Sequence, residues 1–353
     1  MKDLIVKPNI TIRDAMKVLE KTAEKCLIVV DVHDNHKLLG TVTDGDLRRS
    51  ILKGAKINST IENSFNREPI TVQEGSYTEK EVGELLLQHK IDLIPVLDDQ
   101  KRVVSYITWK QVFGDSKTLK KKTLTAPVVI MAGGRGTRLE PFTKVLPKPL
   151  VPIHDKPIIE HIIERFTSVG VNDFFFMVNY KNRILKAFFE ELNPDYSLSF
   201  IEEQEPLGTA GSLQFLTGKF NEPFLVTNCD IIIDADYIDL YAFHLNNGYD
   251  ITLVASAKEY IRPYGTCELN GDGHLDHIRE KPSYNILVNT GLYILNPETL
   301  KMIPKDRMYH ITELIADAKK RGMKVGVYPI SEDAWIDVGQ WAEYQKAVER
   351  FGR

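Results

Sequence analysis

One glycine-rich stretch has the residue types of a phosphate-binding site. An apolar run at residues 128–131 predicts a buried strand that leads directly into it. Glycines let a backbone approach a ligand closely, and successive N–H groups can point at an anion. Two cations follow, Arg138 and Lys148. These features predict a triphosphate site whose backbone contributors are Ala132, Gly133, Gly134, Gly136 and Thr137.

Two common phosphate-binding motifs do not fit this stretch. It lacks the Gly-Lys-Ser/Thr sequence of a P-loop. Leu139 stands where a dinucleotide-binding fingerprint has its third glycine. The stretch alone therefore indicates a triphosphate and leaves the type of protein open.

Apolar strands and helices alternate after residue 127. Expected strands are 128–131, 174–178, 198–202, 224–227 and 251–255, and expected helices are 157–168, 182–191, 209–216 and 235–246. This alternation predicts an α/β fold with a mostly parallel, doubly wound sheet that binds ligands at the carboxyl ends of its strands. The last third is more mixed, with strands expected at 265–269, 275–280, 288–295 and 325–328 and helices at 311–321 and 340–351.

Length and charge limit the functional classes. With 353 residues the chain is long enough for two or three domains. A net charge of −4 gives no basic surface for nucleic acid or an anionic membrane. The chain starts without an apolar signal segment, and no apolar run approaches the roughly 18 residues of a membrane span. Cys26, Cys229 and Cys267 lack a CxxC spacing, so we expect reduced thiols in a cytoplasmic protein.

Residues 1–116 contain an internal repeat of strand, helix, hairpin and short helix. The two copies cover about residues 1–60 and 61–116. In each copy a hydroxyl residue stands three positions before an acid, at residues 11–14 and 76–79, which predicts a capped helix start. Residues 117–126 are polar and basic and predict a linker to a second domain at 127–353.

The repeat resembles a tandem pair of CBS domains. In that family a Gly-x-x-Thr-x-x-Asp run binds the phosphate and ribose of an adenosine-type nucleotide. The resemblance implies such a site at Thr43 and Asp46 in the first copy, whereas Gln111 replaces the acid in the second. Thr43 and Asp46 fit a helix cap equally well. The pair is expected either to bind a regulatory adenine or guanine nucleotide or to serve as a dimerisation module that makes a homo-oligomer.

The remaining two thirds of the chain resemble the sugar-1-phosphate nucleotidyltransferases. The motifs that carry the resemblance are Gly133-Gly-Arg-Gly-Thr-Arg138, Pro147-Lys-Pro149, Glu205-Pro-Leu-Gly-Thr-Ala-Gly211, Asn228-Cys-Asp230, Pro263-Tyr-Gly265, Glu280-Lys-Pro282, Asn289-Thr-Gly291 and Trp335-Ile-Asp337-Val-Gly339. The resemblance implies a Rossmann-like, GT-A-like domain with a mixed sheet. It also implies an enzyme of nucleotide-sugar biosynthesis that joins an NTP to a sugar 1-phosphate and releases pyrophosphate.

The resemblance assigns catalytic roles to three cations and two acids. Arg138, Lys148 and Lys281 would hold the reacting phosphates. Asp230 and Asp337 would hold Mg²⁺, which prefers carboxylate oxygens. Without the resemblance, Asp230 also fits a helix cap and Asp337 a surface acid. A phosphate monoester with a second pKa of roughly 6 is mostly dianionic at neutral pH, so positioning and electrostatics are expected to replace a general base.

Further residues are implied in ligand binding. Gly208 and Thr209 would join the glycine-rich stretch in holding the nucleotide. Gly265, Glu280 and Asn289 would contact the sugar, although each fits an ordinary polar surface when taken singly.

Glu203, five residues before Gly208, bears on the choice of base. Uridylyl- and thymidylyl-transferring relatives have a glutamine at this position. An ionised glutamate only accepts hydrogen bonds, which suits the adjacent N1–H and 2-amino donors of guanine and not the carbonyls of uracil or thymine. Glu203 therefore favours GTP, provided that neither Glu202 nor Gln204 takes its place.

The layout also resembles the CBS-fused guanylyltransferases found with legionaminic acid pathways. That resemblance implies glucosamine 1-phosphate as the acceptor and GDP-glucosamine as the product. Mannose and heptose 1-phosphates remain open as acceptors. A nucleotide-binding regulator without catalysis is a further alternative, which the intact motif residues disfavour.

Overall fold

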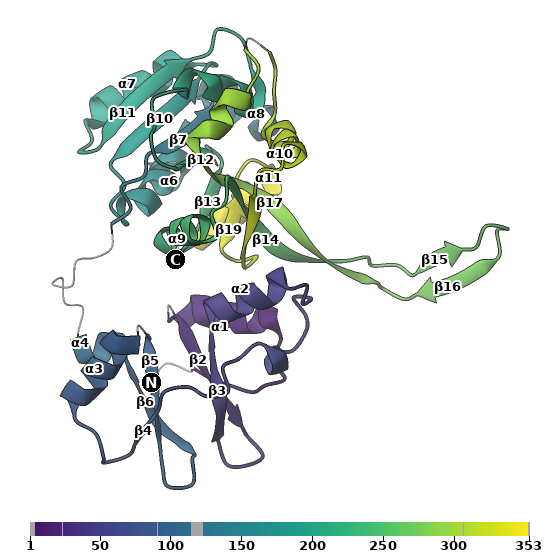
Figure 1. The fold of residues 1–353 in the computed structure, drawn as a ribbon. Helices are drawn as coiled ribbons and strands as arrows, with labels where there is room; N and C mark the ends of the chain where they lie inside the picture. The colour runs from purple at the N-terminus through teal and green to yellow at the C-terminus, as the bar shows by residue number, and fades with distance from the viewer. Residues whose placement is uncertain (1–3, 23, 90, 114–122, 306, 352–353) are drawn as a thin grey trace. The chain divides into compact units, whose positions relative to one another are not determined.

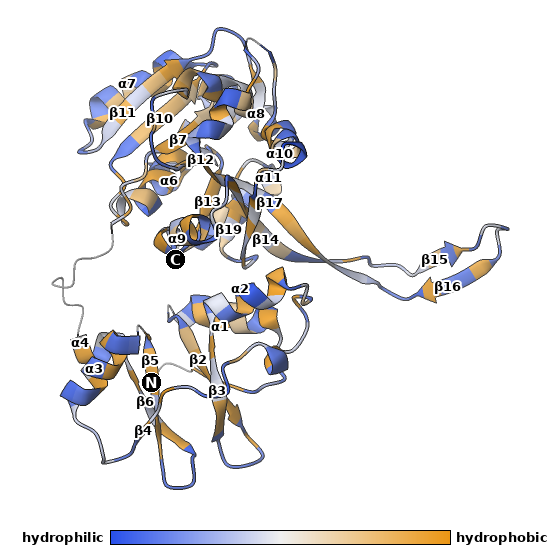
Figure 2. Ribbon diagram, in the orientation of Figure 1, coloured by the Kyte–Doolittle hydropathy of each residue, from blue (hydrophilic) through white to orange (hydrophobic). Residues whose placement is uncertain are grey.

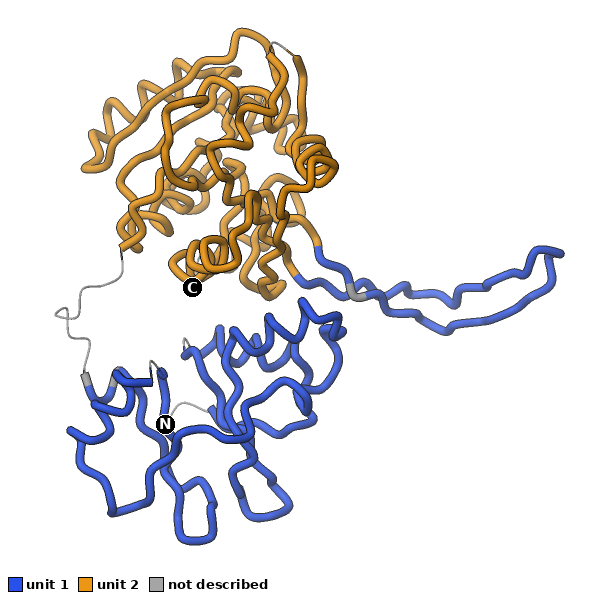
Figure 3. Tube along the Cα trace, viewed as in Figure 1, with its two compact units in different colours: residues 1–121, 257–287 blue, residues 122–256, 288–353 orange. Residues whose placement is uncertain are grey.

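The computed structural model describes residues 4–22, 24–89, 91–113, 123–305 and 307–351. These residues form two compact units (Figure 3). The first unit joins Met1–Lys121 with Ala257–Leu287, and the second joins Lys122–Ser256 with Val288–Arg353. Within the described ranges, no helix is long and apolar enough to cross a membrane.

The first unit contains two copies of one small α/β module (Figure 1). One copy consists of β1 (Ile5–Val6), α1 (Ile12–Thr22), β2 (Cys26–Asp31), β3 (Lys37–Thr43) and α2 (Asp44–Leu52). The other consists of β4 (Val72–Gln73), α3 (Glu79–His89), β5 (Leu93–Leu97), β6 (Val103–Thr108) and α4 (Trp109–Phe113). Each three-stranded sheet has a parallel pair followed by an antiparallel pair. The two copies therefore share one topology.

Side-chain caps start α1 and α3. The predicted cap at residues 11–14 is present, since Asp14 N donates to Thr11 Oγ1 over 3.1 Å. The predicted cap at Ser76 is wrong. Thr78 N donates to Glu81 Oε2 over 2.8 Å, and Glu81 N donates to Thr78 Oγ1 over 3.3 Å. This reciprocal capping box satisfies two backbone donors at once, which moves the helix start two residues along the chain.

The second unit is built on a seven-stranded sheet in the order β11-β10-β7-β12-β17-β14-β18. Its strands are β7 (Val128–Ala132), β10 (Asp173–Val178), β11 (Ser197–Glu202), β12 (Phe224–Asn228), β14 (Ile251–Ile261), β17 (Ser283–Leu295) and β18 (Val325–Ile330). Strands β11, β10, β7 and β12 run parallel, and β17 is antiparallel to β12. The expected α/β class with a mixed sheet is confirmed.

Helices α6 (Ile158–Thr167), α7 (Asn182–Leu192), α9 (Tyr237–Asn247), α10 (Ile311–Lys320) and α11 (Trp341–Phe351) complete this unit. Figure 2 shows hydrophobic residues concentrated on the central strands, and α10 buries one apolar face with Ile311, Leu314 and Ala318. The helix expected at 209–216 is instead a short α8 (Gly208–Gly211) followed by a 3₁₀ segment, Ser212–Leu216. An antiparallel hairpin of β15 (Thr266–Leu269) and β16 (Leu275–Arg279) connects β14 to β17.

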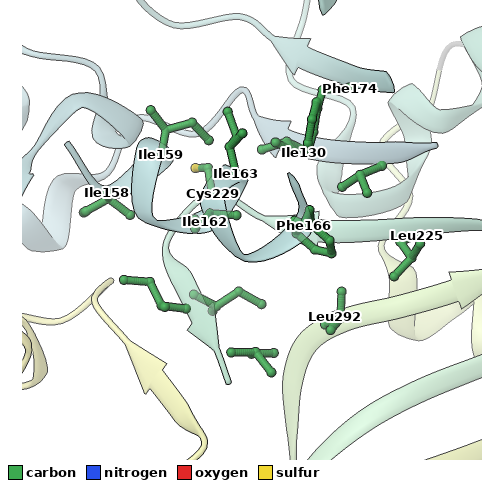
Figure 4. Close-up of a cluster of buried hydrophobic side chains, with 14 of the residues drawn as sticks. Ile130, Ile158, Ile159, Ile162, Ile163, Phe166, Phe174, Leu225, Cys229 and Leu292 are labelled. Carbon is green, nitrogen blue, oxygen red and sulfur yellow. The ribbon is translucent and has the colours of Figure 1, made fainter. Parts of the chain in front are cut away.

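Helix α6 supplies much of the core beneath the glycine-rich stretch. Its buried side chains recur at helical spacing and are Ile158, Ile159, Ile162, Ile163 and Phe166. They pack with Ile130 of β7 and Phe174 of β10 (Figure 4). Cys229 is also buried in this core, and burial raises the pKa of its thiol to about 12. Its side chain therefore packs as a small apolar group.

Part of the predicted linker 117–126 is packed. Leu124 and Ala126 are buried in the core of the second unit, and Leu124 N donates to Val169 O over 2.9 Å. Residues 117–122 lie outside the described residues.

Residues 257–287, which the sequence places within the domain at 127–353, group by their contacts with the first unit.

The cap of α3 gives a stability prediction. Thr78→Ala should lower the free energy of unfolding by about 1 kcal/mol, because it removes the side chain that caps Glu81 N. Ser76→Ala should change it by less than about 0.5 kcal/mol. Urea denaturation of the full chain measures both. Equal losses in the two variants would contradict the assigned helix start.

Candidate functional site

The glycine-rich turn follows β7 and packs on the side-chain stem of Lys148. Gly136 has φ +67°, a left-handed conformation that favours glycine. A Cβ on Gly136 would lie 2.9 Å from Thr143 Cγ2 and 3.0 Å from Lys148 Cβ. Thr143 Oγ1 also donates to Gly136 O over 2.9 Å. The turn therefore fixes where the Lys148 side chain begins, and only a residue without a side chain fits there.

Lys148 forms an ion pair with Asp230 at the carboxyl end of β12. The Lys148 and Asp230 side chains are only 11% and 10% exposed. A Cβ on Gly339 would lie against Asp230 Oδ2, 2.9 Å from Asp337 Oδ1 and 3.1 Å from Lys148 Nζ. The absence of a side chain at Gly339 thus leaves a cradle between two carboxylates and a cation.

A short two-stranded ladder brings the two acids together. Strand β13 (Ile231–Ile233) pairs antiparallel with β19 (Trp335–Asp337), and Ile231 lies opposite Asp337. Val338 N donates to Asp230 O over 2.9 Å, and Gly339 N donates to Asp337 Oδ1 over 2.9 Å. The register of this ladder, rather than sequence proximity, makes Asp230 and Asp337 neighbours.

The cradle fits a magnesium ion. Asp230 and Asp337 present hard carboxylate oxygens to one space that a Cβ would fill. Among the residues that the structure describes, no group of three or more His, Cys, Asp or Glu side chains could hold a metal ion. Two carboxylates are nevertheless sufficient for Mg²⁺, which keeps several waters and takes further oxygens from substrate phosphates.

Glu203 lies over the start of the glycine-rich turn. It is 8% exposed, and its Oε1 would lie 3.3 Å from a Cβ on Gly133. Leu207 N donates to Glu203 Oε2 over 3.3 Å. Burial raises the pKa of Glu203 above its ordinary value of 4.5, and the bond from Leu207 N–H partly offsets that shift.

The neighbours of Glu203 face elsewhere. Glu202 is exposed and forms an ion pair with Lys186, and Gln204 is exposed. Glu203 is therefore the residue of this segment that points at the glycine-rich turn.

The remaining nucleotide-binding candidates have mixed surroundings. Arg138 is exposed and, over the described ranges, makes no ion pair. Gly208 has φ +81°, and a Cβ there would lie 2.8 Å from Tyr309 O. Thr209 Oγ1 accepts from Ile311 N over 3.0 Å and so caps α10. Gly208 and Thr209 thus have structural contacts that explain their residue types without a ligand.

Two of the three residues expected at the sugar, Gly265 and Glu280, lie at the β15–β16 hairpin together with the expected phosphate-binding Lys281. Glu280 Oε2 would lie 3.0 Å from a Cβ on Gly265, so these two predicted residues are adjacent. Lys281 is exposed and has φ +43°, a conformation that costs a non-glycine residue of order 1–3 kcal/mol and occurs often at ligand sites. Asn289 lies on β17 in the second unit, where its Nδ2 donates to Tyr293 OH over 2.7 Å.

Thr43 and Asp46 form a complete capping box at the start of α2. Asp46 N donates to Thr43 Oγ1 over 3.2 Å, and Thr43 N donates to Asp46 Oδ2 over 2.9 Å. In the second copy, Thr108 N donates in the same way to Gln111 Oε1 over 2.7 Å. Helix capping therefore accounts for both pairs, and a nucleotide at Thr43 and Asp46 stays a prediction.

Comparison with known proteins identifies the second region. The family model described as Nucleotidyl transferase matches residues 127–352, which is more than half of the chain. The chain belongs to the nucleotidyl transferase family. A CBS domain model matches residues 1–53, the first copy of the repeat.

Curated relatives of this nucleotidyl transferase chain include mannose-1-phosphate guanyltransferases. The protein from Hypocrea jecorina is 37% identical over 221 residues, and that from Schizosaccharomyces pombe is 35% identical over 225 residues. The matches cover 60% and 61% of this chain and the same shares of the two relatives. The chain thus spans about 60% of the length of these relatives.

Solved structures of similar fold include HddC from Yersinia pseudotuberculosis. It is 28% identical with a TM-score of 0.51, and the match covers 64% of this chain and all of HddC. HddC complexed with GMP-PN is 27% identical, has a TM-score of 0.50 and has the same coverage. A putative glucose-1-phosphate thymidylyltransferase from Bacillus anthracis shares the fold at 22% identity and a TM-score of 0.51, over 64% of this chain and 94% of its own.

The sequence patterns do not identify two residues of this nucleotidyl transferase site. Gly339 provides the space between the acids, and only its place in the Trp335–Gly339 motif hinted at this. Asn179 Nδ2 donates to Glu203 O over 2.7 Å and so holds the backbone of Glu203. Its position directly after β10, at a strand end, is the signal that could have found it.

The raised pKa of Glu203 predicts a pH-dependent stability. A carboxyl whose pKa is higher in the folded state stabilises the fold below its unfolded value of 4.5, and this contribution is lost as the pH rises through the raised pKa. Glu203→Gln should therefore raise the free energy of unfolding at pH 7, and the gain should vanish below pH 4.5. Denaturation at several pH values measures this. The exposed Glu202→Gln is the control, and an equal gain there would contradict the assignment.

Proposed function

We propose that this chain transfers GMP from GTP to a sugar 1-phosphate, giving a GDP-sugar and pyrophosphate. The observation that carries the choice of base is the buried Glu203 carboxylate over Gly133. An ionised carboxylate accepts both the N1–H and the 2-amino donors of guanine. The names of the guanyltransferase relatives and the GMP-PN complex of HddC support the same base.

The reaction requires stabilisation of the negative charges on the reacting phosphates rather than a general base. A sugar 1-phosphate is mostly dianionic at neutral pH, since its second pKa is roughly 6. One of its oxygens forms the new bond to the α-phosphorus of GTP while the bond to the β-phosphate oxygen breaks and pyrophosphate leaves. Lys148 lies at the carboxylate cradle, where it would screen the two approaching phosphates, and Arg138 is free to hold the leaving pyrophosphate.

Magnesium fits the cradle of Asp230 and Asp337. When bound there, it would neutralise charge on the triphosphate and the leaving pyrophosphate. Lys148 partly neutralises Asp230 through their ion pair.

Two sugar 1-phosphates are the leading candidates for the acceptor of GMP. Glucosamine 1-phosphate follows from the resemblance to CBS-fused guanylyltransferases of legionaminic acid pathways. Mannose 1-phosphate follows from the names of the curated relatives.

We further propose a cytoplasmic homo-oligomer, held by the CBS pair and regulated by an adenine or guanine nucleotide at Thr43 and Asp46. Calorimetry of the full chain with AMP, ATP and GTP, with and without Asp46→Ala, tests the nucleotide.

Base selection is tested by Glu203→Gln. A matrix of four NTPs against glucosamine, mannose and heptose 1-phosphates, with pyrophosphate release as the readout, should show GTP as the preferred donor. Glu203→Gln should lower kcat/KM for GTP by roughly 10- to 100-fold, because it replaces a charged acceptor of two hydrogen bonds. Glu202→Gln should keep the GTP preference. An unchanged preference in Glu203→Gln would remove Glu203 from base recognition.

The metal assignment is tested by Asp337→Asn. The variant should need a Mg²⁺ concentration about tenfold or more higher for half-maximal activity, since it removes one negative charge from the cradle. Asp234→Asn is the matched control, because Asp234 directly follows β13, the strand that pairs with the strand of Asp337, and its side chain is 54% exposed. Chelation by EDTA should abolish turnover in the wild type. A Mg²⁺ requirement that is the same in both variants would exclude Asp337 as a ligand.

A further inference from the structure

The segment that follows β10 contacts both sides of the predicted nucleotide site, and all of its contacts lie within the second unit. Asn179 directly follows β10, and its Nδ2 donates to Glu203 O over 2.7 Å. A Cβ on Gly133 would lie 3.5 Å from Asn179 Cβ, so Asn179 also packs on the first glycine of the turn. Lys181 stands two residues later, immediately before α7. The segment 179–181 therefore starts at the backbone of Glu203 and ends at a lysine.

The ammonium group of Lys181 binds the carboxyl end of α5 (Phe142–Val145), the short helix that follows the glycine-rich turn. Lys181 Nζ donates to Lys144 O over 2.5 Å and to Thr143 O over 3.3 Å. The last carbonyls of a helix have no partner within that helix, and a cation there supplies hydrogen bonds and interacts favourably with the helix dipole. Lys181 therefore ties α5 to the segment after β10.

Thr143 connects Lys181 to the glycine-rich turn. Its backbone carbonyl accepts from Lys181, and its Oγ1 donates to Gly136 O over 2.9 Å. Thr143 is only 3% exposed, and its Cγ2 lies 2.9 Å from the place of a Cβ on Gly136. A displacement of α5 would therefore displace Gly136, and with it the stem of Lys148 that packs on the same glycine.

The backbone of Lys181 is in a conformation that a lysine does not favour. Its φ is +54°, in the left-handed region that glycine adopts readily. Strained conformations of this kind persist only where the surrounding structure fixes them, and they cluster at ligand sites. A glycine would suit the backbone here, but it could not reach the carbonyls of α5. The contacts of the ammonium group therefore explain why a lysine stands at this position.

We propose that Lys181 is a positioning residue for the triphosphate, which holds the glycine-rich turn in place through α5 and Thr143 without touching the nucleotide. The inference rests on the proposed function, in which residues 133–137 hold the triphosphate of GTP. A turn that is already ordered loses less conformational entropy when a ligand binds, so it binds more tightly. Removal of the ammonium group should therefore weaken the binding of every NTP, whatever its base.

Steady-state kinetics of full-length proteins tests this role. Lys181→Met should raise KM for GTP about tenfold, because two charge-assisted hydrogen bonds to α5 are lost. KM for the sugar 1-phosphate and the preference for GTP over UTP should not change. Lys181→Arg keeps the cation and should restore most of the affinity for GTP. Lys186→Met is the matched control, since Lys186 of α7 pairs with the exposed Glu202, and it should behave as the wild type.

A second variant, Lys181→Gly, separates positioning from a general effect on folding. Glycine adopts φ +54° without strain, so Lys181→Gly should unfold at a higher urea concentration than Lys181→Met. Both variants lack the ammonium group, so both should show the same raised KM for GTP. A KM for GTP that instead follows the stability of the two variants would overturn the inference.

The outcomes separate the inference from the function on which it rests. An unchanged KM for GTP in Lys181→Met, or an equal rise in KM for the sugar 1-phosphate, would overturn the inference while the proposed function stands. A wild type that releases no pyrophosphate with any NTP and sugar 1-phosphate would remove the proposed function. Calorimetry with GTP then decides the inference: weaker binding to Lys181→Met than to Lys186→Met supports it, and equal binding or none in both variants overturns it.

Discussion

The ion pair between Lys148 and Asp230 is the constraint on which the catalytic region depends. Removing both charges from water costs several kcal/mol per ion, and only close mutual contact with further partners offsets that cost. Asp230 stands at the end of β12, and Lys148 is anchored by the packing of its stem on Gly136. The parallel order β10-β7-β12 places the two segments at one edge of the sheet. The glycine turn, the β13–β19 ladder and Gly339 all serve to keep these charges close without an intervening side chain.

Much of this arrangement follows from local sequence patterns. The apolar runs at β7, β10, β11 and β12 predicted strands to within a residue or so, because buried parallel strands are continuously apolar. The strand-end rule then placed the glycine turn and Asp230 at the same edge. The spacing from Gly208 favours Glu203 over Glu202, and of the two only Glu203 is buried.

Other features depend on contacts that no local pattern contains. The register of β13 against β19 is set by tertiary pairing, so the closeness of Asp337 to Asp230 was only implied by resemblance. The start of α3 was misplaced because two hydroxyl residues compete for the cap, and the one with a glutamate three residues later completes the box. The residue types at Thr43 and Asp46 suit a helix cap and a nucleotide-binding site equally well, so the sequence does not distinguish the two roles. The equivalent box at Thr108 and Gln111 shows that capping tolerates the loss of the acid.

The hairpin carries a consequence for how the protein is made. Their contacts assign residues 257–287 to the N-terminal unit, yet these residues are synthesised after most strands of the catalytic sheet. Arg13 is synthesised long before Glu259, so the ion pair between them cannot form until late in translation. Domains commonly fold in order of emergence. The contacts of the first unit with residues 257–287 can therefore form only after most strands of the catalytic sheet have been synthesised.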